Sequence, residues 1–178
     1  MAPFKSKYFS DVLIAILLFV LTGNLTAQNL KQSLASLRGV NKAGVIVEKV
    51  NQVLYNNGMR EDDLRNVAIG ELDSSGITVV QNSVMQKLPG SPYLYINAGA
   101  VKAKLGDLYA VKLTVEFRQD VILSRNPKQI YYGAATWSAS DVGIFTADKL
   151  KEIKEYTKEM VKNFITDYIK ANKMSNTH

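Results

Sequence analysis

The feature that most constrains the fold is the run "LYAVKLTVEFRQDVIL" at 108–123, in which apolar and polar residues alternate. A period of two is typical of a β-strand that buries one face and exposes the other. The apolar phase comprises Tyr109, Val111, Leu113, Val115, Phe117, Val121 and Leu123. So long a strand needs neighbouring strands and a layer over its apolar face, so we expect a sheet covered by helices.

The preceding run "YLYINAGAVKAK" at 93–104 predicts an antiparallel partner for this strand, joined to it through "KLGD". If Lys104 lies opposite Asp107, small apolar residues face large ones across the pair. The predicted partners are Ala100 with Val111, Ala98 with Leu113, Ile96 with Val115 and Leu94 with Phe117. Leu-Gly is not a favoured two-residue turn, so a four-residue loop with the same register is equally compatible.

Two more strands, at 44–50 and 77–80, flank the amphipathic pattern "REDDLRNVAIGELDSSG". That pattern predicts a helix with acidic residues in its first turn, where the helix dipole favours negative charge, and with Gly76 as the cap at its end. "IYYGAATWS" predicts a last strand, and 147–172 a long helix with one apolar stripe. We therefore expect an α+β fold: an antiparallel sheet of about five strands, in the order strand-helix-strand-strand-strand-strand-helix, with two main helices packed on one face.

The first residues have the pattern of an export signal. Lys5 and Lys7 precede an apolar run at 12–21, which ends before the small-residue exit at Ala27. Ten helical residues span about 15 Å, half of a hydrocarbon core of about 30 Å. We expect a cleaved signal peptide at 1–27, a single α+β domain at 28–172 and a disordered tail at 173–178. The protein would be periplasmic or secreted, without a stable transmembrane anchor after cleavage.

The residues that several kinds of catalytic, metal and lipid-attachment sites require are missing from the sequence. The chain has no cysteine, and its single histidine is the terminal His178. A lipid-modified cysteine, a disulfide, a His-assisted nucleophile and a Cys/His zinc site are therefore excluded. No phosphate-binding glycine loop or EF-hand pattern is present. We expect neither a cofactor nor a metal.

A carboxylate pair remains the one route to catalysis, as in glycosidases. The candidates are Glu48, Glu116, Asp120 and Asp141, although each also suits a strand edge or turn. Nucleic acid is not expected as a partner, because the lysines of the last helix are interleaved with glutamates and form no basic stripe.

The polar phase of the long strand predicts a recognition surface. If Ile130 and Tyr132 continue the inward phase, Trp137 points outward, beside Glu116, while Arg118 lies between Tyr93 and Ala135. The candidate partner- or ligand-binding residues are Tyr93, Tyr95, Lys112, Glu116, Arg118, Tyr131 and Trp137. Aromatic rings with an arginine are enriched at recognition surfaces. Two alternatives place Trp137 against a loop such as 81–92, or in the core through the opposite strand phase.

Several segments carry a resemblance: "LRGV", "VIVEKV", "DDLRNVAIGELDSSGITVV", "PYLYIN", "LYAVKLTVEFRQDVIL", "ATWS" and "NFITDYIKAN". From Leu37 to Asn172 the chain resembles a family of small uncharacterised bacterial exported proteins. The resemblance implies export and a single domain, and supplies no activity. Arg60 stands where relatives tend to have a capping Ser or Thr, which implies a weaker start for that helix. More remotely, the element order resembles small periplasmic modules accessory to outer-membrane assembly or transport.

The leading interpretation is a non-catalytic periplasmic binding or scaffolding module, such as an accessory to an envelope complex, whose aromatic and charged sheet face holds an envelope protein or a small ligand. The alternatives are a carboxylate-based hydrolase of a cell-envelope polymer and a carrier of a small apolar ligand between sheet and helices. Acids converging in a deep cleft would favour the hydrolase, an apolar cavity the carrier, and a flat aromatic patch the scaffold.

Overall fold

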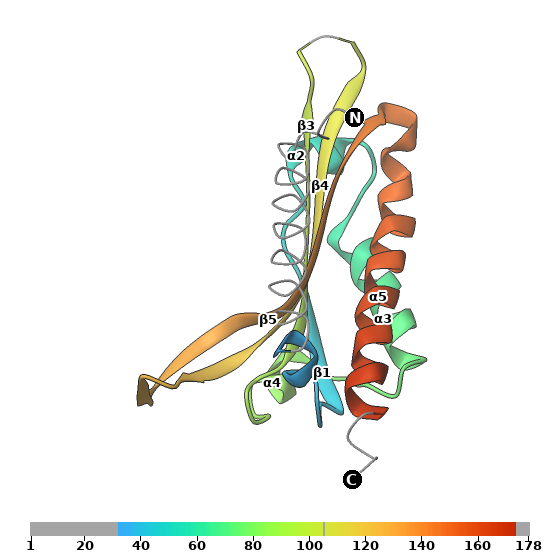
Figure 1. The fold of residues 1–178 in the computed structure, drawn as a ribbon. Coiled ribbons are helices and arrows are strands. Elements are labelled where there is room, and N and C mark those ends of the chain that lie inside the picture. Colours follow the sequence, from blue (N-terminus) through green and yellow to red (C-terminus); the bar gives the residue numbers. More distant parts are fainter. Residues whose placement is uncertain (1–31, 105, 174–178) are drawn as a thin grey trace, which may run out of the picture.

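A computed structural model describes residues 32–104 and 106–173 of the chain (Figure 1). Its strands form one sheet in the order β2-β1-β3-β4-β5. The elements are β1 (Lys42–Val47), α2 (Gln52–Asn56), α3 (Glu61–Asp73), β2 (Thr78–Val79), α4 (Asn82–Met85), β3 (Tyr93–Lys102), β4 (Leu108–Leu123), β5 (Asn126–Thr146), the 3-10 helix η1 (Ala147–Glu152) and α5 (Ile153–Lys173).

The predicted fold class is confirmed: five strands form a sheet, with α3 and α5 on the same side of it (Figure 1). The main strands and helices follow the predicted order. The predicted signal peptide at 1–27 lies outside the described residues, as does the predicted tail from residue 174 onward. Lys173, the first residue of that predicted tail, is the last residue of α5.

The sheet is mixed rather than antiparallel throughout. β3 pairs antiparallel with β4, and β4 with β5, but β1 pairs parallel with both β2 and β3. Parallel neighbours need a crossover connection, and α3 provides it between β1 and β2. Gly76 ends this crossover with a φ of +87°, which confirms the predicted left-handed cap.

The predicted register between β3 and β4 is confirmed. All four predicted pairs occur, from Leu94 with Phe117 to Ala100 with Val111. These apolar side chains are buried together against the helices. The small residues Ala98 and Ala100 lie opposite larger ones across the pair. This face of the sheet is called the inner face below.

The helices α3 and α5 close the inner face. Phe164 of α5 stacks on Phe117 of β4, with ring centroids 5.3 Å apart. Two ion pairs then join the helices to each other: Lys154 to Asp63 at 2.8 Å and Lys158 to Glu71 at 3.6 Å. The two helices therefore form one layer over the sheet.

Two elements differ from the sequence prediction. β5 continues eight residues beyond the predicted strand end at Ser138, to Thr146. The segment expected to be only a loop, 81–92, contains the short helix α4, which buries Met85. Met85 packs against Gly44 of β1 beside Tyr93, so this apolar side chain anchors the otherwise polar segment to the sheet.

Beyond Arg118 the β4–β5 pair bends out of the sheet and forms a projecting hairpin (Figure 1). The register shifts between Gln119 and Val121, and Gly133 on the other strand has a φ of +61°. A register irregularity with a left-handed glycine bends a strand pair. As a result Val121 and Leu123, predicted to continue the inner face, are only half-buried.

Candidate functional site

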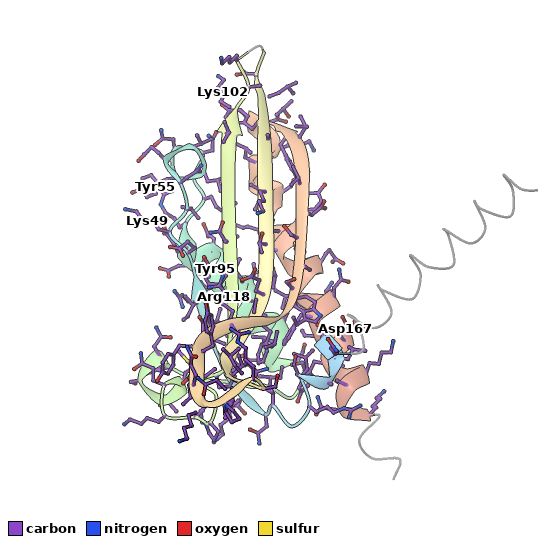
Figure 2. The ribbon with its side chains drawn as sticks, turned by 60° about the vertical axis from the view of Figure 1, so that its left-hand side comes forward. Lys49, Tyr55, Tyr95, Lys102, Arg118 and Asp167 are labelled. Carbon is purple, nitrogen blue, oxygen red and sulfur yellow. The ribbon has the colours of Figure 1, made fainter. Side chains whose placement is uncertain are left out.

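The opposite face of the sheet, called the outer face below, carries the predicted recognition residues of β3 and β4. Figure 2 shows this face in front of the helices. Cross-strand rows run over β3, β4 and β5: Tyr93–Arg118–Ala135, Tyr95–Glu116–Ser138, Asn97–Thr114–Ser140, Gly99–Lys112–Val142 and Val101–Ala110–Ile144. These rows take every second residue of each strand, so successive rows are about 6.6 Å apart and the five rows span about 26 Å along the strands.

The lower rows hold an ordered charged and aromatic cluster, in which Tyr95 and Arg118 lie side by side (Figure 2). The guanidinium of Arg118 lies 3.9 Å from the centroid of the Tyr95 ring, a cation–π geometry. Its Nη2 and Nε donate to the same Glu116 oxygen, Oε2, at 2.6 and 2.7 Å. Ring stacking and two charge-assisted hydrogen bonds hold the arginine in one position.

Tyr95 connects this cluster to β1. Its hydroxyl donates to Oε2 of Glu48 at 2.7 Å, and Asn97 donates to the same hydroxyl at 3.3 Å. Burial raises the pKa of Tyr95 above its ordinary value, and Glu48 raises it further, against the opposing effect of Asn97. The phenol is therefore neutral at physiological pH and acts as a hydrogen-bond donor.

Arg118 stays charged in this setting. Burial alone would lower the pKa of Arg118, but hydrogen bonds to Glu116 and Tyr93 raise it above the ordinary value. The Tyr93 hydroxyl also occupies the space beside Gly133, where an added Cβ would lie 2.8 Å from it. Tyr93 thus packs under the base of the hairpin and ties it to the cluster.

The upper rows are apolar and exposed. Val101 of β3 is 69% exposed on the outer face, and Val142 and Ile144 of β5 are 66% and 67% exposed there. Lys112 lies between Gly99 and Val142 and is exposed as well. The structure therefore brings together three predicted residues on the lower rows, Tyr95, Glu116 and Arg118, whereas Lys112 lies on the same face in the row of Val142. Tyr93 completes the lowest row.

Trp137 was expected on this face, and that placement is wrong. It is only 6% exposed and belongs to the inner-face core. Its ring meets Phe164 edge to face with centroids 5.2 Å apart, and its Nε1 donates to Oδ2 of Asp167 at 2.9 Å. The prediction that Glu116 faces Trp137 is wrong too, because Ser138 takes that place.

A β-bulge accounts for the error. Arg118 pairs with Ala135 as predicted, but the next pair is Phe117 with Trp137, so Thr136 is an extra residue on β5. One extra residue exchanges the two faces for every later position of the strand.

Ile130 and Tyr132, predicted to face the core, are instead exposed on the hairpin, as is Tyr131.

Tyr131 lies beyond the bend, with Val121 as its cross-strand partner, and so does not join the outer-face rows. Sequence reasoning missed four residues of the outer face: Val101, Glu48, Val142 and Ile144. The signal for the last two was present, since "DVGIFT" continues an alternating pattern without proline. Glu48 had no such signal, because its link to Tyr95 follows from the parallel β1–β3 pairing.

The four candidate catalytic carboxylates lie in three places. Glu48 and Glu116 are bound within the Tyr95–Arg118 cluster. Asp120 accepts a hydrogen bond from the Gly133 N–H at 2.9 Å at the base of the hairpin. Asp141 lies elsewhere, in the lining of a groove beside α5. The four carboxylates named from the sequence thus form no common site.

No metal site emerges in the part of the chain that the structure describes. There, no three His, Cys, Asp or Glu side chains gather closely enough to hold a metal ion. Within residues 32–104 and 106–173, no helix has both the length and the hydropathy to cross a bilayer.

A groove of about 590 Å³ opens between α5, η1 and the upper ends of β4 and β5. Its apolar lining comprises Leu108, Val111, Leu113, Phe145, Ile153 and Met160. Its polar residues include Asp141, Glu159 and an ion pair between Lys149 and Glu152 at 2.5 Å. This groove is a second candidate for ligand binding, and it shares Ile144 with the outer face.

Comparison with known proteins leaves the family open. No protein-family model matches the sequence, and no curated protein matches it. Among solved structures, a single-residue variant of the PelC dodecamer from Paraburkholderia phytofirmans is 16% identical, with a TM-score of 0.43 over 74% of this chain and 89% of that one. A minor lipoprotein from Acinetobacter baumannii is 9% identical, with a TM-score of 0.40 over 74% and 92%. Likenesses this weak assign neither a family nor a function to the chain.

Proposed function

We propose that the protein is a non-catalytic binding module that holds a partner protein on the outer face of its sheet. The observation that carries the proposal is the exposure of Val101, Val142 and Ile144, each about two-thirds exposed on a part of the sheet face that α3 and α5 do not cover. Apolar side chains grouped in this way on a folded protein are typical of an interaction surface.

The cluster at the lower end supports a protein partner. Tyr and Arg are among the residues that dominate binding energy at protein interfaces. Arg118 is already held by Glu116 and the Tyr95 ring, so little of its side-chain freedom remains to be lost on binding. In this arrangement the exposed apolar side chains would anchor the partner, and the preorganised charged cluster beside them would determine which partner binds.

The edge of the sheet adds a second mode of contact. β5 is the last strand of the sheet, and its upper part, 138–146, makes backbone pairs only with β4 among the described residues. A free strand edge presents unpaired N–H and C=O groups to which a partner strand can add. The partner would then contact the apolar outer face and the edge together.

The envelope is the proposed location. This part of the proposal rests on the export pattern at 1–27, with its short apolar run and small-residue exit. An exposed recognition surface on an exported protein suits an accessory role in an envelope complex. The seven-residue recognition set named from the sequence is narrowed here to Tyr93, Tyr95, Lys112, Glu116 and Arg118, with Val101, Val142 and Ile144 added.

The test is a pull-down from envelope extract with the outer face altered. In Val142→Asp/Ile144→Asp, two carboxylates replace exposed apolar side chains, so binding of the partner should be lost while the fold is retained. A control, Ile169→Asp, alters an exposed apolar residue of α5, on the other side of the sheet. The proposal is contradicted if both variants retain the same bound proteins as the unaltered protein.

A carrier of a small apolar ligand is the second candidate, favoured by the groove of about 590 Å³ beside α5, a volume typical of ligand pockets. Titration with the apolar dye N-phenyl-1-naphthylamine tests it. A carrier predicts saturable binding that weakens in Leu108→Trp, which narrows the groove, and is unchanged in Val101→Asp/Val142→Asp, which alters two outer-face residues that do not line the groove. Absence of saturable binding would eliminate the carrier and leave the outer-face proposal untouched.

A further inference from the structure

The projecting hairpin has a composition unlike the rest of the surface. Its residues 121–132, "VILSRNPKQIYY", include two cations and no acidic residue. The hairpin extends away from the helices, on the side of the outer face (Figure 1). It therefore presents its side chains to something other than the protein's own core.

Its exposed side chains are large and apolar. Ile122 and Ile130, which are cross-strand partners, are 63% and 49% exposed. Tyr132 follows Ile130 by two residues, lies on the same side of the strand and is 76% exposed. Ile122, Ile130 and Tyr132 thus form an exposed apolar surface, and Tyr131, which is 58% exposed, lies on the other side of the strand.

The two cations of the hairpin are unneutralised. Arg125 in the turn and Lys128 beside it are exposed, and neither forms an ion pair with a described residue. The adjoining acid, Asp120, is bound to the backbone of Gly133. Lys128 precedes Ile130 by two residues, so alternation places it on the side of Ile130 and Tyr132.

The hairpin is preformed. Asp120 binds Gly133 across its base at 2.9 Å, and the Asp120 N–H donates to the Gly90 carbonyl at 2.7 Å. Little ordering is then needed when the hairpin meets a surface, which favours binding.

We propose that this hairpin binds the surface of an anionic lipid bilayer, with Ile122, Ile130 and Tyr132 in the interfacial layer and Arg125 and Lys128 against the lipid phosphates. Apolar side chains, tyrosines at the boundary and nearby cations are the mixture that interfacial membrane segments use. Charge complementarity favours an anionic lipid surface, since residues 121–132 carry two cations and no acidic residue, and lipid phosphates supply negative charge over the whole surface. This proposal goes beyond the proposed function, because it uses residues that the outer-face rows do not include.

The test is sedimentation of the protein with vesicles, using equal parts of phosphatidylglycerol and phosphatidylcholine against phosphatidylcholine alone. We expect binding to the anionic vesicles, and weaker binding when salt is raised from about 0.05 M to about 0.5 M, because salt screens exposed charges. Arg125→Ala/Lys128→Ala should weaken the affinity by roughly 25-fold, about fivefold for each cation near an anionic surface.

A matched control separates a specific contact from general attraction. Lys151→Ala/Lys170→Ala removes two exposed cations from η1 and α5, and should leave most of the affinity. Ile130→Ser/Tyr132→Ser keeps the charges, removes the apolar contact and should also weaken binding. All variants share the same N-terminus, so the apolar run at 12–21 contributes equally to each.

Three results would overturn the proposal. The first is no difference between the two kinds of vesicle. The second is an equal loss of affinity in both double-alanine variants, which would mean unspecific attraction to a basic protein. The third is a change of sedimentation coefficient in Ile130→Ser/Tyr132→Ser without lipid, which would make the hairpin a contact between protein copies. Loss of vesicle binding leaves the pull-down on the outer face unaffected, so the two proposals can fail separately.

Discussion

Neighbouring residues of β4 have opposite surroundings. On the inner face, Leu113, Val115 and Phe117 are buried under α3 and α5. On the outer face, Lys112 is exposed between Gly99 and Val142. Both faces belong to one backbone with one set of strand pairs, so the difference lies in what covers them.

The comparison separates stability from recognition. Inner-face side chains contribute burial and close packing, so altering them leaves a cavity. Outer-face side chains in the upper rows contribute little to folding and remain free to contact a partner. The two roles can therefore be altered independently by substitutions one residue apart.

The largest effect is expected at Trp137, which the sequence alone left between the two faces. Trp137→Ala should lower the free energy of unfolding by about 3–5 kcal/mol, because a buried ring leaves a cavity beside Phe164. Trp137→Phe should cost less, since only the hydrogen bond to Asp167 and part of the ring are lost. Urea unfolding measures both, and a mild loss in Trp137→Ala with solvent-exposed emission in the unaltered protein would return Trp137 to the surface.

The adjacent pair Leu113 and Lys112 compares the two faces most closely. Leu113→Ala should cost roughly 2–5 kcal/mol, whereas Lys112→Ala should stay within about 0.5 kcal/mol. Thermal and urea unfolding of the two variants gives the difference directly. Equal costs would mean that the outer face is also covered in the folded protein.

Gly133 tests how the hairpin is joined to the outer face. Gly133→Ala puts a side chain at a φ of +61° and within 2.8 Å of the Tyr93 hydroxyl. The backbone strain alone should cost about 1–2 kcal/mol. Gly99→Ala is the control, since its Cβ would meet open space on the outer face. If unfolding experiments gave both variants the same stability, the bend at Gly133 would be absent from the folded protein.

The smallest effect concerns the helix layer over the inner face. The Lys154 ammonium, with the Arg60 N–H, lowers the pKa of Asp63 despite partial burial. A carboxylate with a lowered folded pKa stabilises the fold above its unfolded pKa, about 3.9, and that contribution disappears as pH falls through the folded value. Asp63→Asn should therefore cost at most about 1 kcal/mol at pH 7, because the pair is partly exposed.

This cost should shrink below about pH 4, as unfolding experiments from pH 7 to pH 3 would reveal. The control is Lys154→Met, in which Asp63→Asn should have a smaller effect at pH 7. A cost that stays constant down to pH 3 would mean that the ion pair contributes nothing.

The inner face was predictable because two independent patterns agreed. The alternation from Tyr109 to Phe117 identifies the buried phase, and the small residues Ala98 and Ala100 select one register against it. The parallel pairing of β1 was not predictable in this way. It depends on where the crossover through α3 returns the chain, which no local pattern of β1 encodes.

The candidate site was predictable only up to the bulge. Tyr95, Glu116 and Arg118 follow from the β3–β4 register, which is regular. Trp137 does not, because an extra residue at Thr136 reverses the faces and "GAATWSAS" carries no sign of it. Small residues fit on either side of a strand, so the sequence around the bulge does not indicate which residues face the core.

The most direct test of the central claim, that the outer face holds a partner protein, is photo-crosslinking in living cells. A p-benzoylphenylalanine at position 142 reports contacts of the upper outer face, and the same residue at position 151 reports contacts of the exposed side of η1. The account predicts a specific adduct with another protein at position 142, lost when Ile144→Asp is added, and none at position 151. No adduct at position 142, or the same adduct at both positions, would contradict it.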